Sequence, residues 1–476
     1  MLLQNIHIIT IIIPLLMGFF SFVIKDKHEY VINRIYYFLF LLFFFYVLYG
    51  VFEFNLIDGN EYKIVVGGWK KAMGIELKYN LKCALATLSS IFVLLVLFAN
   101  NLKNEMSYAF RGFSCIMLCG VNGMIATNDI FNSYVFFEII CITTYIIYSH
   151  GENKTCLKNA YNYMILSGFS SVVFLLVACL LYQITSNLNI DIINQSIEPF
   201  AKSKAVSAIF VLFVCAMMFK IGFYPFHNIL FEIYKNLSIK YLIVVAGLSS
   251  IIYPFFILKF TTTLFGEEVI LNNEYLNISL KIFGVIGFIF FNAMAISVVD
   301  VLSFVISLSF AQTTLFAFCL PYVFDKQISN GLLFALSSHS LIKVCILSIL
   351  YQIQKQTKIL KIKKTDISFI SSKTYKYLLV LLLFLLSGMP FSLVFMSKWY
   401  ILSGLFNSYG NMFWLSMIIV GFAMDIFACF MLIKKILVKN DSLKTEVKNN
   451  YFVVGNVIFI ILFLVVSSFF VGKFNY

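Results

Sequence analysis

Charged residues are scarce in this sequence. They make up only 12% of the 476 residues, whereas 61% of the residues are hydrophobic. Soluble domains are about a quarter charged and about half apolar, so the composition excludes a soluble globular protein and indicates one embedded in a membrane. The net charge of +13 comes mainly from lysines in short segments between apolar runs, where they indicate topology and contact anionic lipid. We therefore expect the lipid bilayer as the surroundings of the chain, and no nucleic acid as a partner.

Motifs for redox or metal chemistry are also missing. Ten cysteines are present, but none form a C-x-x-C pair and nearly all lie in apolar runs, where cysteine packs as a small hydrophobe. Cys115 and Cys119 share a helix face, and burial is favoured there over a metal site. No flavin or iron–sulfur motif is present. We expect no cofactor, no metal and no catalytic centre within the chain, so whether it works as part of an enzyme stays open.

No long polar linker divides the sequence, which predicts one membrane-embedded domain over residues 1–476. Apolar runs of about 20 residues are typical of spanning helices. The first run has no basic leading region and no small-residue cleavage site, so we expect a spanning helix rather than a signal peptide. About fourteen spanning helices are expected, near residues 4–24, 31–53, 81–100, 107–126, 130–149, 159–183, 205–224, 238–260, 278–299, 301–321, 331–353, 376–400, 409–433 and 451–472.

The segments between these runs predict the topology. Residues 53–80 form the longest connection on one side, and the paired glycines Gly67 and Gly68 between alternating residues predict a small hairpin. Cytoplasmic loops are enriched in lysine and arginine. With both termini outside the cytoplasm, the inside loops hold about twice as many basic residues as the outside segments. We expect a multi-pass protein of the cell inner (plasma) membrane with both termini non-cytoplasmic.

Ionisable residues inside the expected spans are few and energetically costly. Lys220 lies deep in the apolar run 205–230, and a lysine at such depth costs roughly 2.5–3.5 kcal/mol on the insertion scale. Gly222 and Pro225 follow it, and proline removes a backbone donor and clashes one turn back, so we expect the helix to break there. Glu138 lies in another span, either as a protonated acid bonded to a neighbouring helix or as a proton-carrying partner of Lys220. We favour the second interpretation.

The second half of the sequence repeats this arrangement at Lys398, which follows Gly388 and Pro390. A second broken helix is therefore expected. Paired breaks in corresponding halves of a membrane protein indicate an internal repeat with two half-sites. The predicted fold is all-α, with two inverted five-helix repeats over residues 107–260 and 278–433, three helices at 1–100 before them and one at 451–472 after them.

The span expected at residues 331–353 carries His339 and Lys343, which are four residues apart and so lie on one helix face. Histidine titrates near neutral pH, and the pKa of a lysine is lowered by burial, so together they make a plausible proton relay. A histidine satisfied within the core is the alternative. Auxiliary candidates are polar residues near the breaks or in neighbouring spans, namely His227, Ser249, Ser250 and Asp425. Asp425 is expected to pair with Lys398, to act as an exit group or to form an interfacial ion pair.

At these residues the sequence resembles the antiporter-like subunit family. This family includes the D-type membrane component of Mrp-type monovalent cation/proton antiporters and the proton-pumping membrane subunits of respiratory complex I. The resemblance covers nearly the whole chain, and its motifs are ordered along it: GGWKKAMGIEL (67–77), Glu138, KNAYNYMILSGFSS (158–171), FKIGFYPFH (219–227), SSHSLIKV (337–344) and GMPFSLVFMSKWYILSG (388–404).

The resemblance implies a D-like, proton-translocating membrane subunit of a multisubunit Na⁺/K⁺–proton antiporter. Its partners would be the other membrane subunits of that complex, together with protons and monovalent cations. The proton path implied by the family motifs comprises Glu138, Lys220, His339, Lys343 and Lys398. The alternative is a proton-pumping membrane subunit of NADH:quinone oxidoreductase (complex I) or of a related membrane-bound complex. Lys398 favours the D-like branch, because one complex I relative has an acid there.

Two positions depart from the family pattern. The family usually carries a further lysine in its eighth helix, where residues 244–255 contain none, and Asn80 replaces an acid usual after the hairpin. A central relay then needs Ser249, Ser250 or water as a bridge, and a paralogue kept only for assembly stays a possible interpretation. A transferase acting on lipid-linked substrates would need clustered carboxylates or His–Asp pairs at a membrane interface, which we do not find.

Overall fold

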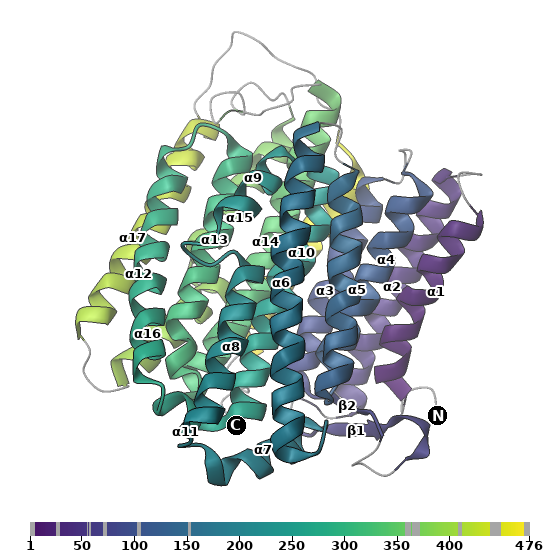
Figure 1. Cartoon of the computed structure of the whole chain (residues 1–476). Coiled ribbons are helices and arrows are strands. Elements are labelled where there is room, and N and C mark those ends of the chain that lie inside the picture. Colours follow the sequence, from purple (N-terminus) through teal and green to yellow (C-terminus); the bar gives the residue numbers. More distant parts are fainter. Residues whose placement is uncertain are drawn as a thin grey trace.

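The computed structural model describes residues 5–24, 29–54, 56, 59–69, 74–101, 106–150, 154–357, 363, 372–407, 412–437 and 449–470. Most of these residues form helices that lie side by side with their axes along one direction (Figure 1). Thirteen helices of the described part are long and apolar enough to cross a membrane. The chain is thus a multi-pass membrane protein of the all-helical class, as its composition predicts.

The helices of the first half are α1 (Ile6–Ile24), α2 (Glu29–Glu53), α3 (Leu81–Asn100), α4 (Tyr108–Ala126), α5 (Ile130–Ser149), α6 (Lys154–Thr185), α7 (Ile190–Ile197), α8 (Lys204–Ile221), α9 (Asn228–Asn236) and α10 (Ile239–Phe260). Those of the second half are α11 (Gly266–Leu271), α12 (Glu274–Ser297), α13 (Val301–Cys319), α14 (Lys326–Thr357), α15 (Lys373–Ser387), α16 (Leu393–Asn407), α17 (Met412–Leu437) and α18 (Tyr451–Phe470).

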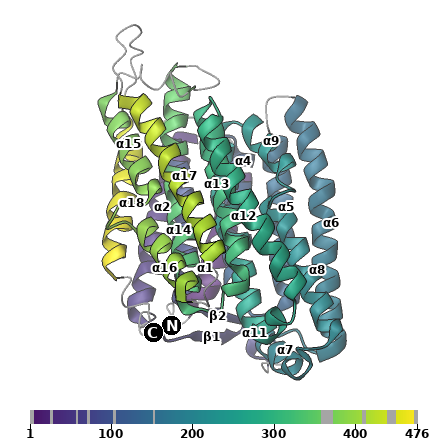
Figure 2. The ribbon, with the colours of Figure 1, turned by 90° about the vertical axis from the view of Figure 1, so that its left-hand side faces the viewer.

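The predicted hairpin is present. Strands β1 (Tyr62–Val65) and β2 (Glu76–Tyr79) pair antiparallel. Gly67 and Gly68 adopt φ angles of 79° and 70°, a left-handed conformation that favours glycine. The hairpin lies at the end of the bundle where α1 begins and α18 ends (Figure 2). Asn80 then caps α3 by accepting a hydrogen bond from the backbone N–H of Cys83 at 3.0 Å, which accounts for an amide at this position.

Both expected helix breaks are present. Helix α8 ends at Gly222 with φ of 71°, and the chain resumes as the short helix α9. Helix α15 ends at Gly388 with φ of 88°, and α16 follows after a short turn. The run expected as one span at 376–400 is therefore two helices of 15 residues each. Each is shorter than a spanning helix, which explains thirteen spans rather than about fourteen.

The two broken helices run in opposite directions. Helix α8 begins near the hairpin end and α9 lies nearer the other end, whereas α15 lies far from the hairpin and α16 nearer to it (Figures 1 and 2). Both breaks thus fall between the two ends of the bundle.

Two short helices at the hairpin end, α7 and α11, were not among the expected elements (Figure 1). Helix α7 buries Ile190, Ile193 and Ile197, and Asn189 caps its first turn. This amphipathic spacing after an N-cap residue is a helix signal, but eight residues are too few to register as a span.

Helix α10 lies at the centre of the bundle. It packs against α3, α4 and α8 on the side of the first half and against α14 on the side of the second. In the helical stretch Ile239–Leu271, which begins with α10, 89% of an apolar segment of 18 residues is buried. The corresponding share for α6 is 39%. The outer helices, such as α6 and α17, expose large apolar side chains that include Phe169 and Phe427, as expected of surfaces that face lipid. Helix α10 therefore lies between the two halves, which also contact each other directly where α9 packs against α13.

Candidate functional site

Lys220 lies in the last turn of α8, and its side chain is buried among three helices. Its residue is only 3% exposed. The ammonium donates to Sγ of Cys141 on α5 at 2.8 Å and to Oγ of Ser167 on α6. It also lies 4.7 Å from the ring centre of Phe137, within range of a cation–π interaction. The lysine that the sequence singles out is thus held by a thiol, a hydroxyl and an aromatic face.

Glu138 does not form the expected ion pair with Lys220. Among the described residues no ion pair joins the two, and the Lys220 ammonium donates to Cys141 and Ser167 instead. The reason is the rotation of α5. Phe137 and Cys141 are four residues apart and together face Lys220, so Glu138 lies on the adjacent face of the helix.

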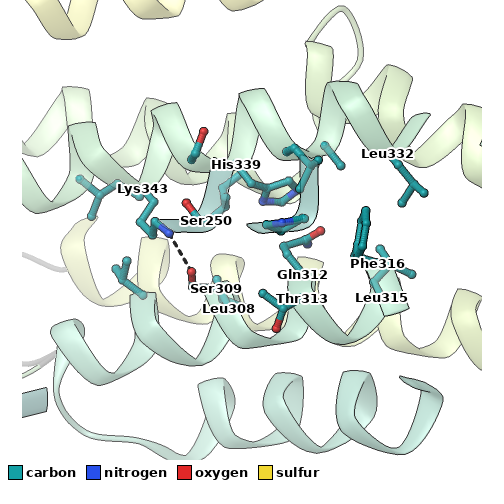
Figure 3. A pocket seen from close by; sticks show the side chains of 17 residues that line it. Ser250, Leu308, Ser309, Gln312, Thr313, Leu315, Phe316, Leu332, His339 and Lys343 are labelled. Atoms are coloured by element: carbon teal, nitrogen blue, oxygen red, sulfur yellow. Dashed lines mark hydrogen bonds between the residues drawn. The ribbon is translucent and has the colours of Figure 1, made fainter. Parts of the chain in front are cut away.

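His339 and Lys343 line one cavity of about 50 Å³, as the spacing of these residues on α14 predicts (Figure 3). Polar side chains from two other helices share its wall: Ser250 from α10 and Ser309, Gln312 and Thr313 from α13. The Lys343 ammonium donates to Oγ of Ser309 at 2.9 Å and to the carbonyl oxygen of Ala246 on α10 at 2.8 Å. A cavity of this size with several polar groups can hold a few water molecules.

Lys398 on α16 forms a buried ion pair with Asp425 on α17. The Nζ to Oδ2 distance is 2.6 Å, and the two side chains are 10% and 2% exposed. The ammonium also donates to the carbonyl oxygen of Ser387 at 3.0 Å, a carbonyl that the end of α15 leaves available. Of the three roles expected for Asp425, the pairing with Lys398 is therefore the one that is confirmed.

The auxiliary candidates lie in different places. His227 packs in the connection between α8 and α9, stacked on Tyr224 with ring centres 5.7 Å apart and with its edge toward Phe291 at 4.7 Å. Ser249 on α10 is hydrogen-bonded to the hydroxyl of Tyr234 at 3.2 Å. Ser250, the next residue, faces the cavity of Lys343. Of these candidates, Asp425 contacts Lys398 and Ser250 lines the cavity of Lys343.

Two buried cations were not singled out from the sequence. Arg111 on α4 is fully buried and donates to Oγ of Ser21 at 3.2 Å and to Oδ1 of Asn33 at 3.3 Å, which ties α4 to α1 and α2. Lys259, in the last turn of α10, donates to the carbonyl oxygens of Ile125 and Thr127 at 2.9 and 2.5 Å. One feature of the sequence could have identified both residues, namely a basic residue within an expected spanning helix. Lys259 caps α4 at the hairpin end and does not reach Lys220 or Lys343.

A buried carboxylate holds the hairpin in place. Glu76 of β2 is 3% exposed and accepts hydrogen bonds from the side-chain amides of Asn128 at 2.7 Å and Asn189 at 2.8 Å. Beside it, Asp129 caps α5 by accepting from the backbone N–H of Asn132 at 2.7 Å. Burial raises the pKa of the Asp129 carboxyl above its usual value.

A second cavity, of about 350 Å³, opens at the hairpin end of α14. Its wall includes Glu61, Lys82 and Lys326, and also Ser329 and Leu333 of α14. One and two turns further along the same helix, Leu336 and His339 line the cavity of Lys343. The two cavities therefore follow each other along one side of α14.

The model of a family described as NADH:quinone oxidoreductase/Mrp antiporter, TM, matches residues 127–424. The D-type component of the Na⁺/H⁺ antiporter of Alkalihalophilus pseudofirmus is 28% identical over 231 residues, which are 47% of this chain and 46% of that protein. Its counterpart in Bacillus subtilis is 27% identical over 186 residues, 38% of each protein. The chain thus spans less than half the length of these curated relatives.

Solved structures match over nearly the full length. One match is a chain of the membrane-bound sulfane sulfur reductase, an archaeal respiratory membrane complex, with a TM-score of 0.85 at 19% identity. The match covers 98% of this chain and 96% of that chain. A chain of the Mrp complex from a Dietzia species has a TM-score of 0.85 at 13% identity, with 100% and 97% covered. A chain of respiratory complex I from Thermus thermophilus has a TM-score of 0.81 at 13% identity, with 98% and 97% covered. These likenesses show a shared fold.

Proposed function

The chain belongs to the NADH:quinone oxidoreductase/Mrp antiporter transmembrane family, and from this premise we propose that it is a D-like, proton-translocating membrane subunit of a multisubunit Na⁺/K⁺–proton antiporter. The observation that carries the proposal is a set of buried lysines in an apolar bundle: Lys220 and Lys398 near the two helix breaks, and Lys343 within α14. Ionisable residues inside spanning helices are rare and mark ion or proton pathways. The curated relatives in the comparison are D-type components of Na⁺/H⁺ antiporters, which supports the antiporter assignment.

The proposed proton path has two halves. Glu138 and Lys220 belong to a repeat over residues 107–260, and His339, Lys343 and Lys398 belong to an inverted repeat over residues 278–433. The opposite directions of the two broken helices support this symmetry (Figures 1 and 2). In this structure Lys220 is turned toward Ser167, and we propose that pairing with Glu138 forms in another state of the cycle. In the second half of the path the ion pair is closed, because the Lys398 ammonium is bound to the Asp425 carboxylate.

Opening and closing of such pairs provides energy on the scale that ion transport needs. A change of two units in the pKa of a buried lysine corresponds to about 2.7 kcal/mol. Moving one charge across 100 mV involves about 2.3 kcal/mol. A single pair that forms and breaks can therefore be coupled to the movement of one proton.

The proposed setting is a complex in the cell inner membrane, with both termini outside the cytoplasm and other membrane subunits as partners. Proton flux driven by Na⁺ or K⁺ in everted vesicles, from a strain without antiporters of its own, tests the function. We expect flux with the complete complex and none with Lys220→Ala or Glu138→Gln. Normal flux in either variant would rule out the assigned path.

A membrane subunit of a complex I-type assembly is the second candidate, because its solved chain shares the fold. Purification of the native complex separates the two candidates. Small antiporter subunits in the preparation support the first, and quinone-reductase subunits support the second.

A further inference from the structure

The buried ion pair between Lys398 and Asp425 lies beside the break between α15 and α16, among groups that bind small cations. We propose that Asp425 is the binding site of a monovalent alkali cation, Na⁺ or K⁺, and that the Lys398 ammonium occupies this site when the cation is absent. The proposal rests on the proposed function, because it names the residues that take the cation in the exchange.

Two oxygen atoms hold the Lys398 ammonium. Oδ2 of Asp425 lies 2.6 Å from Nζ, and the carbonyl oxygen of Ser387 lies 3.0 Å from it. Ser387 is the last residue of α15, and the carbonyls in the last turn of a helix have no intrahelical partner and carry partial negative charge. In membrane proteins with broken helices, carbonyl oxygens at such ends coordinate Na⁺. The second broken helix therefore provides a carboxylate and a carbonyl at one point.

The aromatic ring of Phe422 on α17 lies on a third side of the site. Its centre is 5.1 Å from Nζ of Lys398, within the range of a cation–π interaction. An ammonium group and an alkali cation carry the same charge, and both bind carboxylates, carbonyl oxygens and ring faces. The contacts of the Lys398 ammonium therefore show which groups a free cation would meet at this position.

A buried amide oxygen lies at the same turn of α17. Asn292 on α12 is 0% exposed, and its side-chain nitrogen donates to the carbonyl oxygen of Gly421 at 3.2 Å, one turn before Asp425. Its Oδ1 atom has no hydrogen-bond partner among the described residues. A buried polar atom in this state costs free energy, and a cation or a water molecule bound to the cation removes that cost. Asn292 is thus a further oxygen ligand on the α12 side of the site.

The other two lysines of the proposed path have different partners. The Lys220 ammonium is held by the Cys141 thiol and the Ser167 hydroxyl, and the Lys343 ammonium by a hydroxyl and a carbonyl. In the part of the chain that the structure describes, neither forms an ion pair with a carboxylate. Thiols bind soft metals, whereas hard cations prefer carboxylate, carbonyl and water oxygens. The cation site therefore belongs to the second half of the path.

Binding of the cation exchanges it for one proton. The Asp425 carboxylate binds Na⁺ or K⁺ in place of the Lys398 ammonium, and two positive charges beside one carboxylate repel each other. The ammonium therefore loses a proton and becomes a neutral amine. One cation enters and one proton leaves, so the site carries no net charge before or after the exchange. The cation is released when a proton returns to Lys398.

The released proton has a polar cavity nearby. The cavity lined by His339 and Lys343 extends to Leu386, the residue before Ser387 on α15. The carbonyl oxygen of Ser387 in turn accepts the hydrogen bond of the Lys398 ammonium. The exchange site and the cavity therefore share the end of α15.

Binding of radioactive Na⁺ to the purified complete complex tests the site. Asp425→Asn should weaken the binding of one Na⁺ at least about tenfold, since loss of a group that only supports a metal ligand already costs that much. The matched control is Asp325→Asn, because Asp325 lies just before α14 and accepts from the backbone N–H of Gln327 at 2.7 Å. Asparagine keeps this cap, so the control should bind Na⁺ as the wild type does. Unchanged binding in Asp425→Asn would overturn the site.

The pH dependence of binding distinguishes exchange from simple binding. Because one proton competes with one cation, the affinity of the wild type for Na⁺ should fall about tenfold for each unit by which the pH is lowered while Lys398 is protonated. Lys398→Met removes the competing ammonium and should bind Na⁺ more tightly, without this dependence. The titratable groups that lie near Lys398 on α14 and α17 are His339, Asp425 and Cys429. The same pH dependence in Lys398→Met as in the wild type would overturn the exchange.

Thermal stability gives a second readout, which decides the test if Asp425→Asn does not assemble. Lys398→Met leaves the buried Asp425 carboxylate without its ammonium, and Na⁺ or K⁺ can take that place. Replacing choline by Na⁺ or K⁺ at equal ionic strength should therefore raise the melting temperature of Lys398→Met more than that of Lys398→Met/Asp425→Asn. Equal shifts in these two variants would overturn the site.

Cation-driven proton flux in everted vesicles separates this proposal from the proposed function. We expect flux in the wild-type complex, and in Asp425→Asn a rise of at least about tenfold in the Na⁺ concentration for half-maximal flux. The absence of flux in the wild type would overturn the proposed function. Flux in the wild type with an unchanged half-maximal concentration in Asp425→Asn would overturn the cation site and leave the proposed function standing.

Discussion

The ammonium of Lys398 lies 2.6 Å from the carboxylate of Asp425, with both side chains almost fully buried. Breaking a buried pair by removing one partner costs about 3–5 kcal/mol, because a buried charge is left uncompensated. Lys220, beside the break that ends α8, instead donates to a thiol and a hydroxyl. The lysine near the first break is therefore held by a thiol and a hydroxyl, whereas the lysine near the second break is held by a carboxylate.

Asp425→Asn should lower the thermal stability of the complex in detergent more than Lys398→Met/Asp425→Asn does. The single variant leaves the Lys398 ammonium without its carboxylate, whereas the double variant removes both charges. Thermal unfolding followed by intrinsic fluorescence measures the difference. Equal stability of the single and double variants would show that the ion pair does not contribute.

Local signals in the sequence predict the breaks and the hairpin correctly. Gly222, Gly388, Gly67 and Gly68 all adopt positive φ angles, and glycine is the residue that does so at least cost. These features depend on a few neighbouring residues, so no knowledge of packing is needed. The short helix α7 was missed because a span-length window does not detect eight residues.

Contacts between helices were predicted less well, because they depend on how each helix is rotated. Turning α5 by one residue would exchange Phe137 for Glu138 as the neighbour of Lys220. The sequence contains no direct information on that rotation. Likewise Asp425 had three possible roles until the position of α17 beside α16 was known. The tyrosines near Ser249 pass for apolar packing in a span until their hydroxyls are placed in space.

Gly388→Ala should destabilise the protein. Gly388 has φ of 88°, and a Cβ there would lie 3.2 Å from Cδ of Lys398. A left-handed conformation costs about 1–2 kcal/mol for a residue with a Cβ. Gly168→Ala is the control, because a Cβ at this helical position meets nothing within 4 Å. We expect a lower melting temperature for Gly388→Ala and an unchanged or higher one for Gly168→Ala, where alanine favours the helix. Similar values for the two variants would contradict this account.

Glu76→Ala should loosen the hairpin. The substitution leaves the buried side-chain amides of Asn128 and Asn189 without their carboxylate acceptor, at a cost of about 1–3 kcal/mol for each unsatisfied group. Hydrogen exchange of the backbone amides of β1 and β2 should become faster. Glu61→Ala is the matched control, since the Glu61–Lys63 pair is exposed at 45% and 42% and such pairs contribute little. Unchanged exchange in Glu76→Ala would show that other contacts hold the strands.

Asp129→Asn should change how stability depends on pH. Burial raises the pKa of the Asp129 carboxyl, so the folded protein binds this proton more tightly than the unfolded chain does. The resulting stabilisation is present below the ordinary pKa of aspartate and is lost as the pH rises through the raised value. Asparagine keeps the hydrogen bond to the Asn132 N–H, because both residues are good N-caps, and it cannot ionise. The melting temperature of Asp129→Asn should therefore match the wild type near pH 4 and equal or exceed it near pH 8. A variant less stable than the wild type at pH 8 alone would mean that the ionised carboxylate is the favoured form of this cap.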